Sequence, residues 1–114
     1  MRPLWYTLDE NDNPVPCPDI MNMEGFLGDI EKRRVARDQI TSKISVSTVF
    51  LGLDHNHKPD GDPVLWETMI FGGKYDLNQW RATSKKEALK HHKEAVELAK
   101  SELKIRKLFW KKNV

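Results

Sequence analysis

The chain has 114 residues, of which 39% are hydrophobic and 32% are charged, and its formal net charge is +2. This length suits a single domain over residues 1–114, and no apolar run approaches the ~18 residues of a membrane span. The lone cysteine, Cys17, excludes an internal disulfide, and an N-terminus without an apolar leader favours a cytoplasmic protein.

The charge is unevenly distributed along the chain. Residues 1–84 hold nine basic and thirteen acidic residues, whereas residues 85–114 hold ten basic residues and four glutamates. A basic C-terminal segment can attract nucleic acid, an acidic partner or an anionic small molecule. For the lysines as a group, a solvated helix face is the favoured interpretation.

The N-terminal part predicts a hairpin followed by a helix. "PLWYTL" (3–8) alternates like a strand, and "DENDNP" (9–14) is rich in residues that bond their own backbone in turns. "VPCP" (15–18) returns as an edge segment, because prolines cannot donate to a central ladder. Asp19 can then cap a short helix, whose apolar residues recur at helical spacing as far as Ile30.

Four further segments predict strands joined by short connections. "RRVARDQI" (33–40) favours a strand by its position before a tight turn, and "ISVSTVFLGL" (44–53) has the clearest alternation. "VLWETMIF" (64–71) ends at a glycine turn, and "NQWRAT" (78–83) is short and strand-like. Short connections favour antiparallel neighbours in one sheet.

The C-terminal segment predicts the longest helix. Ser84 and Glu87 have the spacing of a capping box, and no glycine or proline follows, so the helix should run to about residue 106 or beyond. His92 is interpreted as a core residue with its hydrogen bonds satisfied. A seam at +3/+4 spacing favours helix packing, and its members are Leu89, His92, Val96, Ala99 and Leu103.

These elements together predict an α+β fold. The expected architecture is a small antiparallel β meander of about four strands packed against the long C-terminal helix, with a short helix inserted near the N-terminus.

The loop "DHNHKPDGD" (54–62) is the segment with the most potential chemistry. His55 and His57 would point the same way in an extended segment, and with Asp54 they could hold the metal of a small hydrolase or nuclease. A strand, and not a helix with a second ligand set, is predicted after the loop. No metal, cofactor or catalytic residue is therefore assigned, and the favoured interpretation is a polar loop shaped by Asn56, Pro59, Gly61 and Pro63.

The strand at 64–71 carries the candidate binding residues. Glu67 stands among large apolar residues, so it is either a polar hook in an aromatic pocket or one half of a cross-strand pair with Arg81. In the first case, tryptophans would stack on a ligand and Arg81 would bind its phosphate. The residues predicted to bind a ligand are Thr48, Asp54, His55, Trp66, Glu67, Thr68, Trp80 and Arg81.

The central motif, "VSTVFLGLDHN" followed by "ETMIFGG", resembles a family of small, mostly uncharacterised phage and prophage proteins. "LWYTLDENDNPVPC" and the segment "ATSKKEALKHH" extend the resemblance over most of the chain. It implies a phage accessory gene product, the class that includes host-takeover and counter-defence factors, acting in the cytoplasm of an infected bacterium.

The leading functional hypothesis is a binding protein that is not an enzyme. It would bind a host protein or sequester an anionic nucleotide-type signalling ligand, with no membrane partner and no favoured role for nucleic acid. A homo-oligomer through the C-terminal helix is expected, because the apolar residues of this helix extend past the predicted sheet. The alternatives are a metal-dependent hydrolase using Asp54, His55 and His57, and a virion or assembly component.

Overall fold

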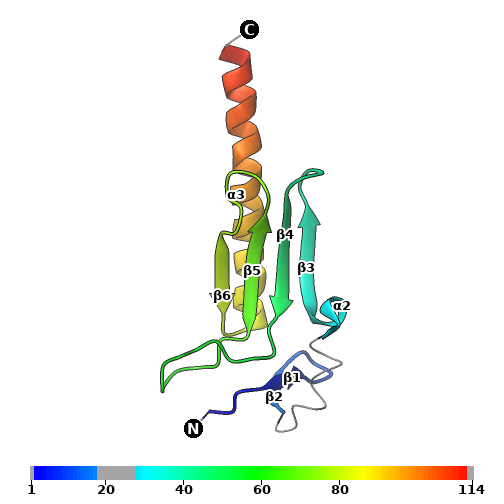
Figure 1. The fold of residues 1–114 in the computed structure, drawn as a ribbon, viewed down its shortest axis with the longest axis vertical. Coiled ribbons are helices and arrows are strands. Elements are labelled where there is room, and N and C mark those ends of the chain that lie inside the picture. The colour runs from blue at the N-terminus through cyan, green and yellow to red at the C-terminus, as the bar shows by residue number, and fades with distance from the viewer. Residues whose placement is uncertain (1, 18–27, 113–114) are drawn as a thin grey trace.

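The computed structural model describes residues 2–17 and 28–112, and their side chains except at 30 and 106–112. A four-stranded antiparallel sheet of order β3-β4-β5-β6 packs against a long helix, α3, and a two-stranded sheet, β1-β2, lies at one end (Figure 1). The α+β meander with a C-terminal helix is thereby confirmed. The elements are β1 Tyr6–Leu8, β2 Pro14–Pro16, α2 Ile30–Arg33, β3 Arg34–Gln39, β4 Ser45–Phe50, β5 Trp66–Phe71, β6 Gln79–Ala82 and α3 Lys85–Lys112.

The N-terminal hairpin forms as predicted but stays separate from the main sheet. Asp9 Oδ1 accepts hydrogen bonds from the backbone N–H groups of Asn11 and Asn13, both at 2.9 Å, which is the self-bonded turn that the sequence indicates. A bridge between Trp5 and Leu53 ties this hairpin to the segment after β4. Most of the helix predicted after the hairpin lies outside the described residues.

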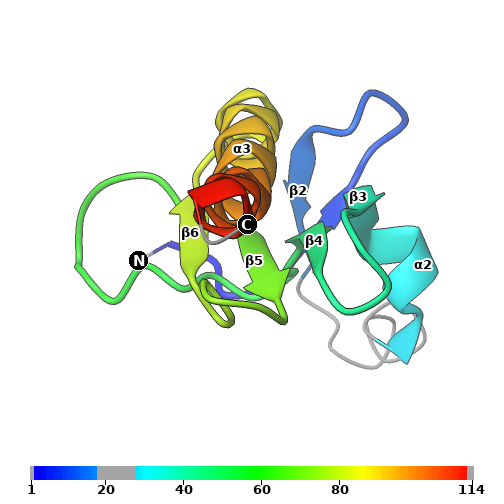
Figure 2. The same ribbon diagram turned by 90° about the horizontal axis from the view of Figure 1, so that it is seen from above.

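Buried and partly exposed residues alternate along β4 and β5, and the buried ones lie on the face of the sheet that α3 covers. On this covered face, Val46 pairs with Ile70 and Phe50 pairs with Trp66, and all four are at most 1% exposed. The rings of Phe50 and Trp66 meet edge to face with their centroids 5.3 Å apart. The helix lies over β5 and β6 more than over β3 (Figure 2). The core therefore lies between α3 and the covered face.

Small side chains bring α3 close to the sheet. Ala88, Ala95 and Ala99 are at most 1% exposed, and His92 is buried among them. The predicted seam is therefore wrong at its start, because Leu89 is 43% exposed while the neighbouring alanine is buried. Alanine at these positions permits a closer approach of helix and strands than leucine would.

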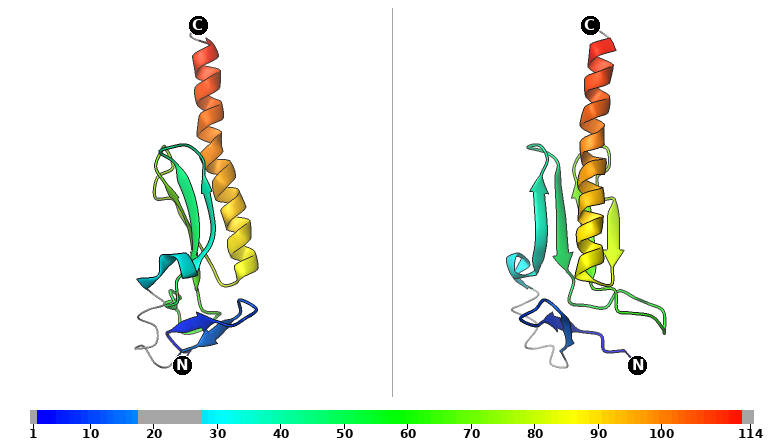
Figure 3. Two further views of the ribbon diagram at one scale, coloured as in Figure 1. Left: turned by 90° about the vertical axis from the view of Figure 1, so that its right-hand side faces the viewer. Right: turned by 180° about the vertical axis from the view of Figure 1, so that it is seen from behind.

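The first turn of α3 has the predicted capping box. Ser84 Oγ accepts a hydrogen bond from the N–H of Glu87 at 3.1 Å, and the Glu87 carboxylate accepts one from the N–H of Thr83 at 3.2 Å. The helix then continues well beyond the ends of the strands (Figures 1 and 3).

The turn between β5 and β6 needs glycine and a contact from α3. Gly72 has a φ of +87°, and a Cβ there would collide with the carbonyl oxygen of Lys43. Glu102 on α3 is buried, and its Oε1 accepts a hydrogen bond from the N–H of Lys74 at 3.1 Å. The helix thereby holds the turn in place.

Candidate functional site

The face of the sheet turned away from α3 has no described helix or strand packed over it (Figure 3). We call it the open sheet face. The strand register places alternate residues of β3 to β6 on this face. They include three arginines, Arg34 and Arg37 in β3 and Arg81 in β6. A shallow groove of about 400 Å³ runs over it, lined by Arg34, Arg37, Ser45, Ser47, Val49, Glu67, Met69 and Phe71.

Glu67 and Arg81 form a cross-strand pair on the open sheet face. They are register partners in β5 and β6, and Arg81 Nε donates to Glu67 Oε2 at 3.1 Å. The Arg81 side chain is 41% exposed, so this pair belongs to the class of ion pairs that contribute at most about 1 kcal/mol. The cross-strand partner expected for Glu67 is confirmed, and its role as a ligand hook stays a prediction.

The other strand residues predicted to bind a ligand lie on the covered face. Thr48 and Thr68 are directly opposed register partners there, and Trp66 and Trp80 point to the same side. Trp66 is only 1% exposed, and Trp80 packs against the second half of the core. These four residues and the Glu67–Arg81 pair are on opposite sides of the sheet, so the predicted set does not form one binding site.

A chain of hydrogen bonds, buried at its threonine end and exposed at its aspartate end, links the sheet to α3. Thr48 Oγ1 lies 2.6 Å from Thr68 Oγ1 and 2.7 Å from His92 Nδ1. His92 Nε2 lies 2.7 Å from the carboxylate of Asp38, on β3. His92 is thus the satisfied core residue that its position on the helix predicts.

This chain has the order carboxylate, imidazole, hydroxyl that a nucleophilic triad uses. The hydroxyl end is closed, because Thr48 is 0% exposed and Thr68 is 1% exposed. A substrate carbonyl cannot reach a hydroxyl in that position, so the chain stabilises the fold and does not act as a nucleophile. Asp38 was not predicted from the sequence as the partner of His92. The only signal for it was that a carboxylate in a predicted strand can pair with a histidine that is predicted to be buried.

The loop after β4 is organised around Arg2. The guanidinium donates to Asp54 Oδ2 at 2.7 Å and to three carbonyl oxygens, those of Asn56, Lys58 and Gly61, at 2.8–3.0 Å. Asp54 Oδ1 accepts the N–H groups of Asn56 and Val64, at 2.8 and 2.9 Å. The loop is therefore a shaped polar loop, and its anchor is a residue 52 positions away in the sequence.

The environment of Asp54 keeps its carboxylate charged. Burial alone would raise the pKa of Asp54, but the hydrogen bonds from Arg2 and from two backbone N–H groups outweigh it and lower the pKa. In each of these hydrogen bonds, an oxygen of the ionised Asp54 carboxylate is the acceptor. A carboxylate committed in this way has little capacity left to hold a metal ion.

His55 and His57 both line an open hollow beside Arg81 and Lys58. Burial and then the nearby Arg81 charge lower the pKa of His55, which favours its neutral form. Within residues 2–17 and 28–105, no three side chains of His, Cys, Asp or Glu are grouped so that they could hold a metal ion. The predicted metal-hydrolase set, Asp54 with the two histidines, is thus not assembled as a metal site.

No protein-family model, curated protein or solved structure matches this chain. In the part of the chain that is described, no helix combines the length and the apolar character needed to cross a membrane.

Proposed function

We propose that this protein is a phage accessory factor that acts by binding, and that its open sheet face binds an acidic surface of a host protein. The observation that carries this proposal is the composition of that face. The groove is lined by two arginines, Arg34 and Arg37, together with the apolar side chains of Val49, Met69 and Phe71. Phe71 is 44% exposed, so part of its ring is available to a partner.

Charge complementarity supports an acidic partner. Of the three arginines on the open sheet face, Arg81 is paired with Glu67 across the strands, and Arg34 is paired with Glu31 at 2.8 Å. Among the described residues, Arg37 donates only to the neutral amide oxygen of Gln39, at 2.7 Å. A carboxylate from a partner is the group that would pair with Arg37, and arginine with apolar side chains is the usual composition of binding hot spots.

Enzymatic alternatives have less support. The buried hydroxyl of Thr48 is closed to a substrate, and Asp54 is committed to Arg2 and to backbone N–H groups. The phage assignment itself follows from the resemblance of the central motif. A virion or assembly role remains an alternative, which co-purification with particles would reveal.

The Arg37 prediction tests the proposed surface. A photo-crosslinking amino acid at Met69 should capture one host protein from infected cells, whereas the same group at the exposed Lys100 on α3 should not. With that protein purified, Arg37→Glu should weaken binding by about tenfold or more, because it replaces attraction to a partner carboxylate by repulsion. The midpoint of thermal unfolding should stay nearly unchanged, since Arg37 is exposed.

Two matched variants sharpen this test. Arg81→Gln should have the smaller effect, because Arg81 is already paired within the chain. Lys86→Glu, an exposed charge reversal on α3, should leave binding unchanged. Equal capture from both crosslinking positions, or full affinity in Arg37→Glu, would rule out the open sheet face as the contact surface.

We also expect self-association through the C-terminal part of α3, which projects past the sheet (Figure 3). Ile105 lies on this part and is 53% exposed, and burial in a second copy would remove it from water. Light scattering should give a mass above that of one 13.3 kDa chain at tens of micromolar for the full chain, and a monomer for a version that ends at Lys104. A monomeric full chain contradicts this expectation, and so does an oligomer that survives the truncation.

A further inference from the structure

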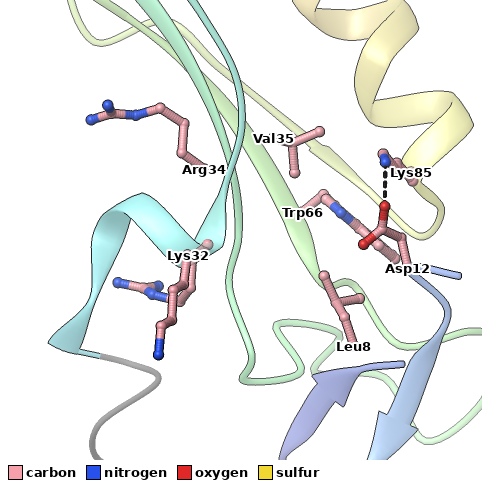
Figure 4. Close-up of a pocket in the computed structure, with 8 residues that line it drawn as sticks. Leu8, Asp12, Lys32, Arg34, Val35, Trp66 and Lys85 are labelled. Carbon is pink, nitrogen blue, oxygen red and sulfur yellow. Dashed lines mark hydrogen bonds and ion pairs between the residues drawn. The ribbon is translucent and has the colours of Figure 1, made fainter. Parts of the chain in front are cut away.

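A second, smaller pocket lies where the β1-β2 turn, the α2–β3 junction, the start of β5 and the first turn of α3 meet (Figure 4). Its volume is about 120 Å³. Four cationic side chains line it, Lys32, Arg33, Arg34 and Lys85, against one carboxylate, that of Asp12. Because Arg34 is paired with Glu31 and Lys85 with Asp12, the net positive charge around the pocket comes from Lys32 and Arg33.

Three buried N–H groups on the residues that line this pocket have no hydrogen-bond partner in the described part of the chain. They are Trp66 Nε1, Arg33 Nε and Arg34 Nε. Among the described side chains only one other buried nitrogen or oxygen shares this state, Nδ1 of His91. Trp66 is 1% exposed, so bulk water does not reach its indole freely. Buried donors in folded proteins nearly always have an acceptor, so an unpaired donor on a residue that lines a pocket is a group that a bound acceptor could satisfy.

We propose that this pocket binds a phosphoryl group, either as inorganic phosphate or as the phosphate monoester of a nucleotide. The unpaired groups are all donors, and the surrounding charge is positive, so an oxyanion is favoured over a neutral ligand or a cation. Guanidinium and ammonium groups are the side chains that recognise phosphate. The pocket has room for the phosphoryl group itself, and an attached nucleoside would lie outside it.

An ion pair at the first turn of α3 places one of the four cations next to Trp66. Lys85 Nζ lies 2.6 Å from Asp12 Oδ2, and Figure 4 shows this pair beside Trp66. The side chains of Lys32 and Arg34 extend away from Trp66 in the same view. Of the four cations, Lys85 is therefore the one that lies beside Trp66, while the cations of the α2–β3 segment add attraction at longer range.

Asp12 is a competitor built into the chain. Its side chain is 50% exposed and that of Lys85 is 41% exposed, so their ion pair is weak and a phosphoryl group can replace the carboxylate at Lys85. Asp12 also sits at a φ of 61°, a conformation that asparagine adopts readily. Asp12→Asn therefore removes the competing charge without disturbing the hairpin turn, and it should tighten phosphate binding.

The test is titration of the full ¹⁵N-labelled chain with sodium phosphate, followed through the four tryptophan indole N–H signals. The signal that is missing in Trp66→Phe should shift to saturation, with a dissociation constant of about 1 mM or below. Sodium chloride at equal ionic strength should not produce this shift. A separate titration with adenosine monophosphate distinguishes the two ligands. If it binds with the same affinity as inorganic phosphate, the pocket recognises the phosphoryl group alone, and if it binds more tightly, the ligand is a nucleotide.

Two further variants keep the proposal open to refutation if Trp66→Phe folds poorly. Lys85→Gln should weaken phosphate binding by about tenfold, and Asp12→Asn should strengthen it several-fold. Trp80→Phe, which changes an indole outside the pocket, should leave the affinity unchanged. The proposal fails if the Trp66 signal does not saturate, if chloride shifts it equally, or if neither charge variant changes the affinity.

This pocket shares one lining residue, Arg34, with the groove of the proposed host-protein surface. Arg37→Glu, which weakens the open sheet face, should leave the phosphate titration unchanged because Arg37 does not line this pocket. Loss of host-protein binding with phosphate binding intact, or the reverse, therefore shows which of the two proposals has failed.

Discussion

Asp54→Ala is expected to lower the free energy of unfolding by about 2–3 kcal/mol, because one carboxylate satisfies three hydrogen-bond donors. These are the Arg2 guanidinium and the backbone N–H groups of Asn56 and Val64. The Asp54 side chain is only 5% exposed, so water does not replace it easily. Urea unfolding at neutral pH measures this difference.

Asp60→Ala is the matched control in the same loop. Asp60 is exposed, and its backbone carbonyl, which the substitution keeps, accepts the hydrogen bond from Asn56. We expect a change below about 0.5 kcal/mol for this variant. A similar loss of stability in both variants would mean that the loop is not organised by the Asp54–Arg2 contact.

The Asp54 contact also predicts a pH dependence. The pKa of Asp54 is lowered in the folded protein, from an ordinary value of 3.8, so its contribution is fully present above that value. The contribution is lost as the pH falls through the lower, folded pKa. The stability difference between wild type and Asp54→Asn should therefore be constant near neutral pH and shrink below about pH 4. A difference that persists unchanged into strong acid would contradict this assignment.

His92→Ala is expected to cost about 2–4 kcal/mol of unfolding free energy, the second large effect. It removes the imidazole that joins Thr48 on the sheet to Asp38 on β3, and it leaves a cavity between α3 and the covered face. Lys93→Ala, the exposed neighbour on the same helix, should change stability by less than about 0.5 kcal/mol. Thermal or urea unfolding of both variants compares them directly.

The two ends of this hydrogen-bond chain should respond differently. The Asp38 side chain is 55% exposed, so Asp38→Asn should cost less than about 1 kcal/mol. Thr48→Val keeps the volume but buries the His92 nitrogen without its partner, so it should cost more. If Asp38→Asn and Thr48→Val lower the free energy of unfolding equally, the contribution of each hydrogen bond does not depend on its burial, and the inference is wrong.

Local patterns in the sequence determined most of the fold. The alternation of "ISVSTVF" and "WETMIF" specified which side chains of β4 and β5 share a face, since a strand has a period of two residues. The spacing of Ser84 and Glu87 specified where α3 begins, because a capping box is a contact between residues three positions apart. The pair Glu67–Arg81 followed from antiparallel neighbours in register. Each of these depends on contacts between residues close in sequence or in adjacent strands.

Only the tertiary structure decided which polar side chains meet and which candidate residues share a face. Arg2 reaches a loop 52 residues away, and Asp38 meets His92 across 54 residues, and no local periodicity reports such pairings. The predicted ligand set was divided because Trp66 and Glu67, adjacent in sequence, point to opposite faces of β5, and burial on one face depends on where α3 packs. The pocket beside Trp66 combines residues of five helices and strands and of the β1–β2 turn, so it exists only after long-range packing has placed them together.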